Sequence, residues 1–273
     1  MDEQARFESV LDTALHRGLG LSETALQLIQ SLMPAGCTFG TMPHASVYRL
    51  HVFATTSYRG ALTCLRWPET SLSTPILLRA LLETWSHIEF IGNDQEGGDV
   101  RCRALRYERG VLRSWSDIAR GHLAWLDMSE WEGQHEEYAR GIDALWQEFG
   151  CGNAAARTNK HAQATLRTLA RRDPHMRWVM PAWASASAIA HGLSSDIPFR
   201  SDGTGTSDLV WARPAGRLAW LGFLIATYDF ATASAAAALG SNGTGQLELD
   251  LRAAALGLGG EVAAQRDREL GKE

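Results

Sequence analysis

The segment Thr74–Gly92, with the sequence TPILLRALLETWSHIEFIG, most restricts how this chain can fold. We predict that it forms one helix that is apolar on most of its surface, and such a helix is normally buried on most sides. Arg79, Glu83 and His87 follow one another at intervals of four residues, so their side chains lie on one face of that helix. The segment therefore predicts a central helix with a narrow polar stripe.

The polar stripe has two interpretations. It can face solvent, in which case Arg79 and Glu83 form an i,i+4 ion pair that stabilises the helix by about 0.2–0.5 kcal/mol. It can instead line a cleft, because Ile76 and Phe90 fall on the same strip of the helix and partly buried charges must be paired. Both interpretations remain open from the sequence.

Helical periodicity recurs along the chain, and no segment makes a convincing strand. We predict an all-α fold, a multi-helix bundle of about nine helices with no significant sheet, in a single domain over residues 1–273. An N-terminal helical pair, residues 1–36, could pack on a bundle formed by residues 43–263. The run GLGLS after Arg17 is expected to separate the two helices of that pair, and the charged tail 264–273 is expected to fray.

Another predicted helix begins at its N-cap residue Asp99, runs to about Met128 and is rich in arginine. Most of its arginines are expected in solvent. In the alternative, one or two turn inward to bind an anion or to neutralise Glu83. The arginines are Arg101, Arg103, Arg106, Arg109, Arg113 and Arg120.

Charge and cysteine content narrow the function classes. The formal net charge of −5 gives no overall electrostatic basis for binding nucleic acid or an anionic membrane. The four cysteines are far apart and form no Cys-x-x-Cys motif, so we expect free thiols in a reducing compartment. The N-terminal sequence MDEQARFESV lacks the apolar core of a signal peptide, and we expect a cytoplasmic protein.

The stretch Leu218–Leu239 is long enough to span a bilayer, and Asp229 is its single charged residue. An aspartate near the centre of a membrane span is costly. The second half of the stretch is also made of alanine, serine and threonine rather than leucine and isoleucine. We therefore predict the central helix of a soluble bundle and no membrane partner.

Three predicted helices carry polar residues among apolar neighbours. They are Thr74–Gly92, a helix of small residues that begins at Pro181, and the long apolar helix that begins at Pro214. If they pack together, they gather an acid, a base, a cation and hydroxyl groups in a dry place suited to general acid–base catalysis. In that site His191 is the candidate base, and Asp229 or Glu83 would fix its tautomer. Alternatively, Asp229 is a structural partner of an arginine and His191 caps its helix. The candidate catalytic residues are Arg79, Glu83, His87, Ser187, His191 and Asp229.

A metal-binding bundle is a competing hypothesis. Di-iron bundles use Glu-x-x-His pairs, and Glu132 with His135 forms one such pair, but the chain has no second. A mononuclear site could use Glu83, His87 and His191. The glycine-rich run SDGTGTSD follows no predicted strand and is not a dinucleotide-binding motif. We therefore expect no metal and no cofactor.

Three short stretches, LLRALLETWSHIEFI, RCRALRYERGVLRSW and SASAIAHG, resemble a loose group of uncharacterised bacterial all-helical proteins, common in actinobacteria and classed as domains of unknown function. The resemblance covers roughly Tyr48–Gly192. It implies an Arg-x-x-x-Glu on one helix, here Arg79 and Glu83, and a Ser-x-x-x-His on a later one, here Ser187 and His191. It implies no particular reaction.

Some proteins of this kind are compared with the HEPN ribonucleases of defence systems, which carry an arginine followed by a histidine after four to six residues. Here Arg157 and His161 have only three residues between them, and Ala184, Ser185 and Ala186 precede His191 where the arginine would stand. The relationship to these ribonucleases is therefore only remote.

Two functions follow as expectations. The first is a cytoplasmic helical-bundle enzyme that acts on a small polar or anionic molecule by acid–base chemistry. The second is a non-catalytic interaction or regulatory protein, of the kind found in defence systems. It would form a homodimer through an alanine-rich or tryptophan-bearing helix face, and its polar stripe would only fix the register of the helices.

Overall fold

The predicted all-α architecture is confirmed by a computed structural model, in which the apolar helix faces meet in one core. The structure describes residues 3–35, 43–92, 99–122, 129–153, 155–157, 159–190, 199–201, 207–209, 214–243, 245–269 and 271. The helices over these residues are α1 (Glu3–Ser31), α2 (His44–Leu65), α3 (Thr74–Gly92), α4 (Val100–His122), α5 (Ser129–Glu148), α6 (Asn159–Arg172), α7 (Val179–Ala190), α8 (Pro214–Ala238) and α9 (Gln246–Glu269).

Short elements connect some of the helices. Two 3-10 turns, η1 (Pro68–Ser73) and η3 (Pro174–Met176), precede α3 and α7. The described β structure is one antiparallel hairpin of β1 (Phe199–Ser201) and β2 (Ser207–Leu209). This hairpin is too small to form a layer of its own, which agrees with the predicted lack of a significant sheet.

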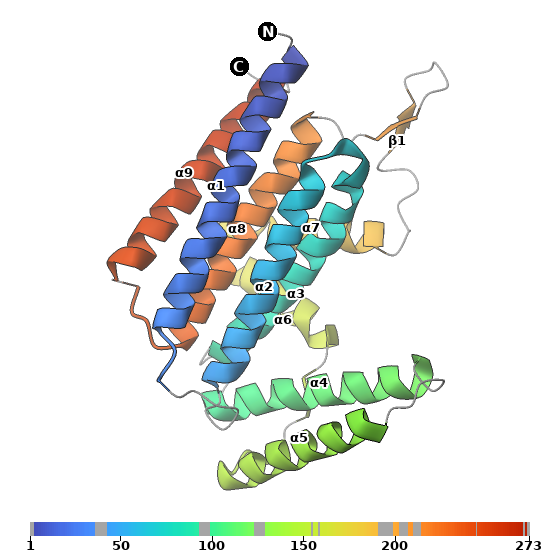
Figure 1. Cartoon of the computed structure of the whole chain (residues 1–273), viewed down its shortest axis with the longest axis vertical. Helices are drawn as coiled ribbons and strands as arrows, with labels where there is room; N and C mark the ends of the chain where they lie inside the picture. The colour runs from blue at the N-terminus through green and yellow to red at the C-terminus, as the bar shows by residue number, and fades with distance from the viewer. Residues whose placement is uncertain are drawn as a thin grey trace.

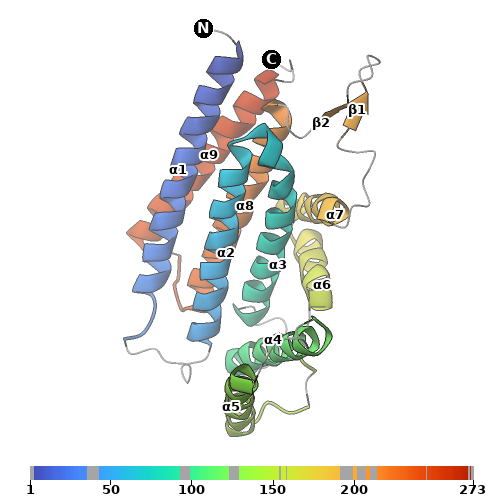
Figure 2. The same ribbon diagram turned by 45° about the vertical axis from the view of Figure 1, so that its right-hand side comes forward.

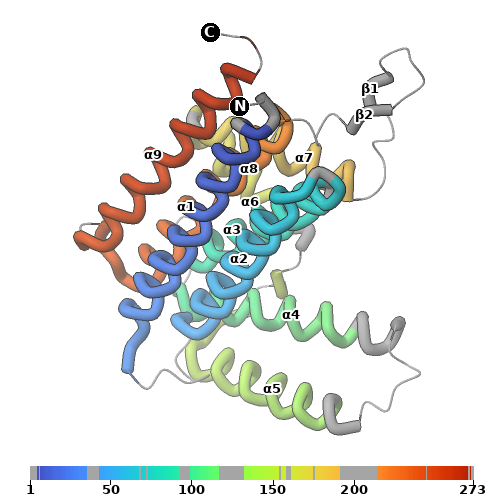
Figure 3. Tube along the Cα trace, turned by 45° about the horizontal axis from the view of Figure 1, so that its top comes forward, coloured from blue at the N-terminus to red at the C-terminus, as the bar shows by residue number. Residues whose placement is uncertain are grey.

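The helices form a bundle with a hairpin across one end. In Figure 1, α1, α2, α3, α8 and α9 run along the long axis of the molecule, and α4 and α5 lie across the lower end. Figure 2 shows α6 and α7 along the outer side of α3. The tube in Figure 3 shows the same crossing of α4 and α5 relative to α2 and α3. The candidate site lies at this crossing.

Helix α3 has the bounds and the central position predicted for it. Leu78, Leu81 and Leu82 are fully buried, and Trp85 donates from its indole nitrogen to the hydroxyl of Ser234 on α8 at 3.1 Å. Helices α2, α8, α7, α6 and α4 all pack against α3. Five neighbours explain why this helix tolerates only a narrow polar stripe.

The predicted break after Arg17 is wrong, because α1 continues through GLGLS to Ser31 as one helix of 29 residues. Ser22, the last residue of this run, is buried. Its hydroxyl donates to the carbonyl oxygen of Leu19 at 2.6 Å and accepts from Arg59 of α2 at 2.7 Å. A side chain on Gly18 would lie 3.0 Å from the hydroxyl of Tyr58, so this glycine lets α2 approach. Packing thus offsets the cost of about 1 kcal/mol for a glycine inside a helix.

The predicted fraying from residue 264 is also wrong over the described residues, since α9 continues to Glu269. Val262 and Gln265 are buried in this stretch, and Gln265 accepts from Arg268 at 2.6 Å. The predicted extension of the arginine-rich helix to Met128 can be compared only up to His122, because residues 123–128 lie outside the described ranges.

Helix α8 is, among the described helices, the one that is long and apolar enough to cross a membrane, and half of its most apolar window is buried. A core helix can pass the same test of length and composition. Helix α8 packs against α1, α2, α3 and α9, as predicted for a central helix.

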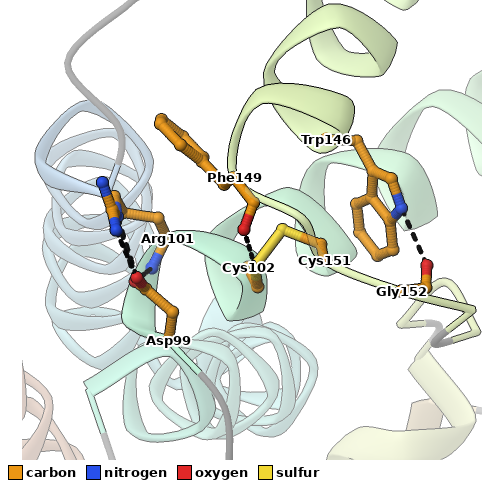
Figure 4. The surroundings of a disulfide bond; sticks show 7 residues. All are labelled: Asp99, Arg101, Cys102, Trp146, Phe149, Cys151 and Gly152. Carbon is orange, nitrogen blue, oxygen red and sulfur yellow. Dashed lines mark hydrogen bonds and ion pairs between the residues drawn. A yellow bond between two sulfur atoms is a disulfide. The ribbon is translucent and has the colours of Figure 1, made fainter.

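The expectation of free thiols is wrong for two cysteines. Cys102, in the first turn of α4, and Cys151, just after α5, form a disulfide with their Cα atoms 5.3 Å apart (Figure 4). The α4–α5 hairpin returns the chain to its starting point across 49 residues, which sequence spacing alone does not reveal. Cys64 is a free thiol, and Cys37 lies outside the described residues.

Arg217 of α8 ties three helices together at the end of α2. Its guanidinium is buried and donates to the carbonyl oxygens of Leu65 at 2.7 Å and Arg66 at 2.6 Å. It also forms an ion pair with Glu8 of α1 at 2.8 Å.

We expect Arg217→Met to lower the free energy of unfolding by about 3 kcal/mol, because it leaves buried carbonyl groups without their donor. Urea unfolding measures the change.

Arg17→Met is the matched control. Arg17 pairs with Glu261 at the surface, where the two side chains are 43% and 63% exposed, so its loss should cost less than about 1 kcal/mol. Equal losses in the two variants would contradict the role given to Arg217.

Candidate functional site

A cavity of about 640 Å³, open to solvent, lies between α2 and α3 on one side and the α4–α5 hairpin on the other. The side chains near its opening differ in exposure and polarity from those in its interior. Phe53 of α2 and Trp115 of α4 line it and are 54% and 50% exposed. His87, Glu108 and Arg157 also line it but are almost fully buried. The cavity therefore leads from exposed aromatic rings to buried polar groups.

Arg157 and His87 meet in the inner wall. Nε of Arg157 donates to Nδ1 of His87 at 3.0 Å, and Nη2 donates to the hydroxyl of Thr165 at 2.8 Å and the carbonyl oxygen of Ser86 at 3.1 Å. The guanidinium also lies 4.0 Å from the centre of the Phe90 ring. Because Nδ1 of His87 accepts a hydrogen bond, the neutral imidazole carries its hydrogen on Nε2.

The backbone of Arg157 reaches this position by crossing α4 at a glycine. A Cβ atom on Gly110 would lie 1.5 Å from the carbonyl oxygen of Arg157. The amide of Arg157 donates to the carbonyl oxygen of Arg106 at 2.9 Å, and Nε of Arg106 donates to the carbonyl oxygen of Ala155 at 3.1 Å. Gly110 therefore determines where the arginine enters the wall.

Glu108 organises the wall formed by α2, α4 and α5. Its Oε1 accepts from the hydroxyl of Ser46 at 2.6 Å and from Arg49, and its Oε2 accepts from the hydroxyl of Tyr138 at 2.6 Å. Burial, together with the negative charge of Glu108, raises the pKa of Tyr138 and of the neighbouring Tyr107 above the usual value. Both phenols therefore stay protonated at neutral pH and can donate hydrogen bonds.

The two interpretations of the α3 stripe both hold in part. Nε of Arg79 donates to Oε1 of Glu83 at 3.0 Å, which confirms the i,i+4 ion pair. Glu83 and His87 also line the cavity. The guanidinium of Arg79 lies 6.0 Å from the ring of Trp183 on α7, so the pair connects the cavity to α7.

The remaining predicted site residues lie elsewhere or cannot be placed. Ser187 is on α7, and its buried hydroxyl makes no hydrogen bond within the described part of the chain. Asp229 of α8 lines a different cavity, of about 370 Å³, between α8 and α9. His191 lies outside the described residues. The structure thus brings Glu83 and His87 together, with Arg79 beside them, but Asp229 lies apart.

The sequence reasoning missed Arg157, Glu108, Arg49 and the two tyrosines of the wall. Arg157 lies in an irregular connection with no periodic pattern, so its direction could not be inferred. The glycine in the middle of the arginine-rich helix was the one available signal of a close backbone contact. One arginine of that helix does turn inward, as the alternative proposed, but Arg103 donates to the carbonyl oxygen of Ile91 at 2.9 Å and not to Glu83.

The metal hypothesis receives no support from the described residues, among which no three His, Cys, Asp or Glu side chains are grouped to hold an ion. Glu132 of the Glu-x-x-His pair is exposed. The ring of His135 lies in the cavity wall, with Nε2 3.2 Å from the hydroxyl of Ser116.

No family model matches this chain, and comparisons with curated proteins and with solved structures find no match.

The buried carboxyl group of Asp229 should make the stability of the protein depend on pH. Burial raises the pKa of this carboxyl group from 3.8 to about 6, although Arg252 opposes the shift. Above pH 6 the folded protein must therefore keep a carboxylate in surroundings that disfavour its charge. The shift corresponds to about 3 kcal/mol, so Asp229→Asn should raise the free energy of unfolding at pH 7 by up to that amount. The gain should shrink as pH falls from 6 and vanish below 4.

Urea unfolding of both proteins across this pH range measures the difference. Asp250→Asn, which removes an exposed carboxylate from α9, changes the net charge equally and should leave the stability unchanged. No gain for Asp229→Asn at pH 7 would show that the carboxylate is well solvated.

Replacing Gly110 by alanine should destabilise the protein. The Cβ atom of alanine cannot occupy a position 1.5 Å from the Arg157 carbonyl oxygen, so Gly110→Ala must displace residues 155–157. We expect a loss of about 1–3 kcal/mol in the free energy of unfolding and faster hydrogen exchange at the Arg157 amide. Gly141→Ala in α5 is the matched control, since its Cβ would meet nothing within 4 Å. That variant should gain up to about 1 kcal/mol from helix propensity. The reverse order of stabilities would contradict the crossing at Gly110.

Proposed function

We propose that the α2–α5 cavity binds a small polar or anionic molecule and acts on it by general acid–base catalysis. The observation that carries this proposal is the convergence of Glu83, His87 and Arg157 on one open cavity of about 640 Å³. That volume lies within the range of small-molecule sites, roughly 300–1,000 Å³. A carboxylate, an imidazole and a guanidinium are also the groups that acid–base catalysis on a polar substrate requires.

The lining supports a ligand with two different ends. Its polar or anionic group would lie inside, where Arg157 supplies a buried positive charge and Tyr107 supplies a neutral donor, since the hydroxyl of Tyr138 already donates to Glu108. Its apolar part would lie between the exposed rings of Phe53 and Trp115 near the mouth. The ligand would bridge α3 and the α4–α5 hairpin.

The hydrogen bonds favour distinct roles for the two proton-transfer groups. His87 keeps its hydrogen on Nε2 while Arg157 donates to Nδ1, so its neutral ring would donate a hydrogen bond or a proton to the substrate. Glu83 shares Oε1 with Arg79, and its second oxygen would accept the proton. Glu108 is less suited to be the base, because Ser46, Arg49 and Tyr138 already donate to its two oxygens.

Native mass spectrometry of the purified protein would first search for a co-purified small molecule. Thermal unfolding with inorganic phosphate, citrate, benzoate and adenosine monophosphate would then test anions of different size and shape. We expect at least one to raise the unfolding temperature. His87→Gln should weaken its binding at least tenfold, the equivalent of about 1.4 kcal/mol, whereas Glu83→Gln removes a negative charge from the cavity wall and should bind the anion at least as tightly as the native protein.

Matched controls separate the cavity from its surroundings. Glu89→Gln changes a carboxylate on α3 that binds Ser234 at 2.9 Å outside the cavity, and His161→Gln changes an exposed imidazole of α6. Both should bind like the native protein. A protein that carries no molecule and responds to none of the four anions would overturn the proposal.

A homodimer is the second candidate function, and one observation favours it. The lining of the cavity between α8 and α9 includes three glycines, Gly222, Gly259 and Gly260, beside larger apolar residues, among them the exposed Leu256. Small residues let a helix of a second copy approach closely. Light scattering would decide, because a strictly monomeric protein at all concentrations would exclude this function.

A further inference from the structure

The connection from Cys151 to Arg157, of which residues 151–153 and 155–157 are described, joins α5 to α6 and carries the arginine into the cavity. It is fixed to α4 at both ends. At its start Cys151 is bonded to Cys102, and at its end the Arg157 amide donates to the carbonyl oxygen of Arg106 at 2.9 Å. The disulfide thus lies on the same connection as the inner wall of the candidate site.

One cysteine of this disulfide, Cys151, lines a second open cavity. Cys151, Arg109 and Trp146 are among the residues that line this space of about 430 Å³. The indole of Trp146 donates to the carbonyl oxygen of Gly152 at 2.9 Å and holds the turn beside the sulfur (Figure 4). Arg109, which also lines this space, brings its guanidinium to 4.0 Å from the centre of the Trp146 ring and pairs with Asp143 of α5 at 2.6 Å.

The other sulfur is placed to leave as a thiolate. Cys102 lies in the first turn of α4, directly after Arg101, whose amide donates to the N-cap residue Asp99 at 2.7 Å. Cys102 therefore lies at the positive end of the α4 dipole, which favours the negative charge that develops on a departing sulfur. The Cys102 sulfur also lies 4.0 Å from the carbonyl oxygen of Phe149, to which its reduced form can donate (Figure 4).

We propose that Cys102 and Cys151 form a thiol–disulfide exchange site that controls the position of Arg157, and that its reaction partner is a dithiol reductant. A thiolate of the dithiol attacks the sulfur of Cys151, forming a mixed disulfide and releasing the Cys102 thiolate, which takes up a proton. The second thiol of the reductant then attacks its own bound sulfur and releases the Cys151 thiolate, which takes up the second proton. Two electrons pass to the protein, and the dithiol becomes a disulfide.

Reduction removes one of the two anchors of the connection. The contact at Gly110 and the hydrogen bonds to Arg106 remain. The disulfide at Cys151, six residues before Arg157, no longer holds the start of the connection to α4. The disulfide closes a loop with a sequence separation of 49, and cutting it restores conformational freedom to the hairpin and the connection. The hydrogen bond between Arg157 and His87 should therefore open more often in the reduced protein.

Hydrogen exchange of the whole protein tests this inference without any ligand. Alkylation with iodoacetamide and intact mass measurement first determine how many thiols are free before and after treatment with dithiothreitol. Treatment should free two more thiols and raise amide exchange in residues 155–157 roughly tenfold, while exchange in α3 stays constant. The Cys102→Ser, Cys151→Ser double variant should show the fast exchange under both conditions. Cys64→Ser should respond as the native protein does.

Several results would overturn the inference. They are cysteines 102 and 151 found as free thiols in the untreated protein, a disulfide that resists dithiothreitol in the folded state, and exchange in residues 155–157 that does not change on reduction. An equal rise in α3 would show a general loss of stability and would also overturn it.

The expected effect of reduction on ligand binding rests on the proposed function. The proposed function and the inference about the disulfide can fail separately. If one of the four anions binds, reduction should weaken its binding about tenfold, and the double variant should bind weakly under both conditions. If none binds, the proposed function fails, and the exchange measurement still decides whether the disulfide controls the Arg157 connection.

Discussion

The close contact between the Arg157 backbone and α4 at Gly110 is the interaction on which the candidate site depends. No side chain fits between them, since a Cβ atom would lie 1.5 Å from the carbonyl oxygen. The contact brings a guanidinium against the imidazole of His87, in the middle of the most buried helix of the bundle. The contact thereby places a buried positive charge beside the polar stripe of α3.

Buried arginines that bind main-chain carbonyl groups recur in this fold. Arg103 donates to the carbonyl oxygen of Ile91 at the end of α3, and Arg217 donates to that of Leu65 at the end of α2. In both cases the guanidinium satisfies carbonyl groups that a helix end leaves without a partner. Arg157 donates to Ser86 in the same way but also borders an open cavity. Two of these arginines thus make structural contacts only, and the third combines a structural contact with a place in the wall of the open cavity.

The sequence predicted the fold better than the site, for physical reasons. Apolar periodicity identified α3 with its bounds, because a helix covered by neighbours on most sides must be apolar on most sides. The same spacing placed Glu83 and His87 on one face, and both line the cavity. Arg157, Glu108 and the disulfide could not be predicted, since they depend on how the α4–α5 hairpin returns across the bundle. Gly18 misled the prediction because its effect depends on packing against Tyr58, not on local propensity.

The crossing of the hairpin over the bundle has a consequence for how such a site can diversify. One wall of the cavity belongs to α2 and α3, where most positions are committed to the core. The opposite wall comes largely from α4 and α5, which lie across the end of the bundle and expose much of their surface (Figure 2). Substitutions on the hairpin can therefore change the shape and charge of the cavity, while the groups on α3 stay in place. Chains with this architecture can alter one wall of the cavity without rebuilding the bundle that supports the other.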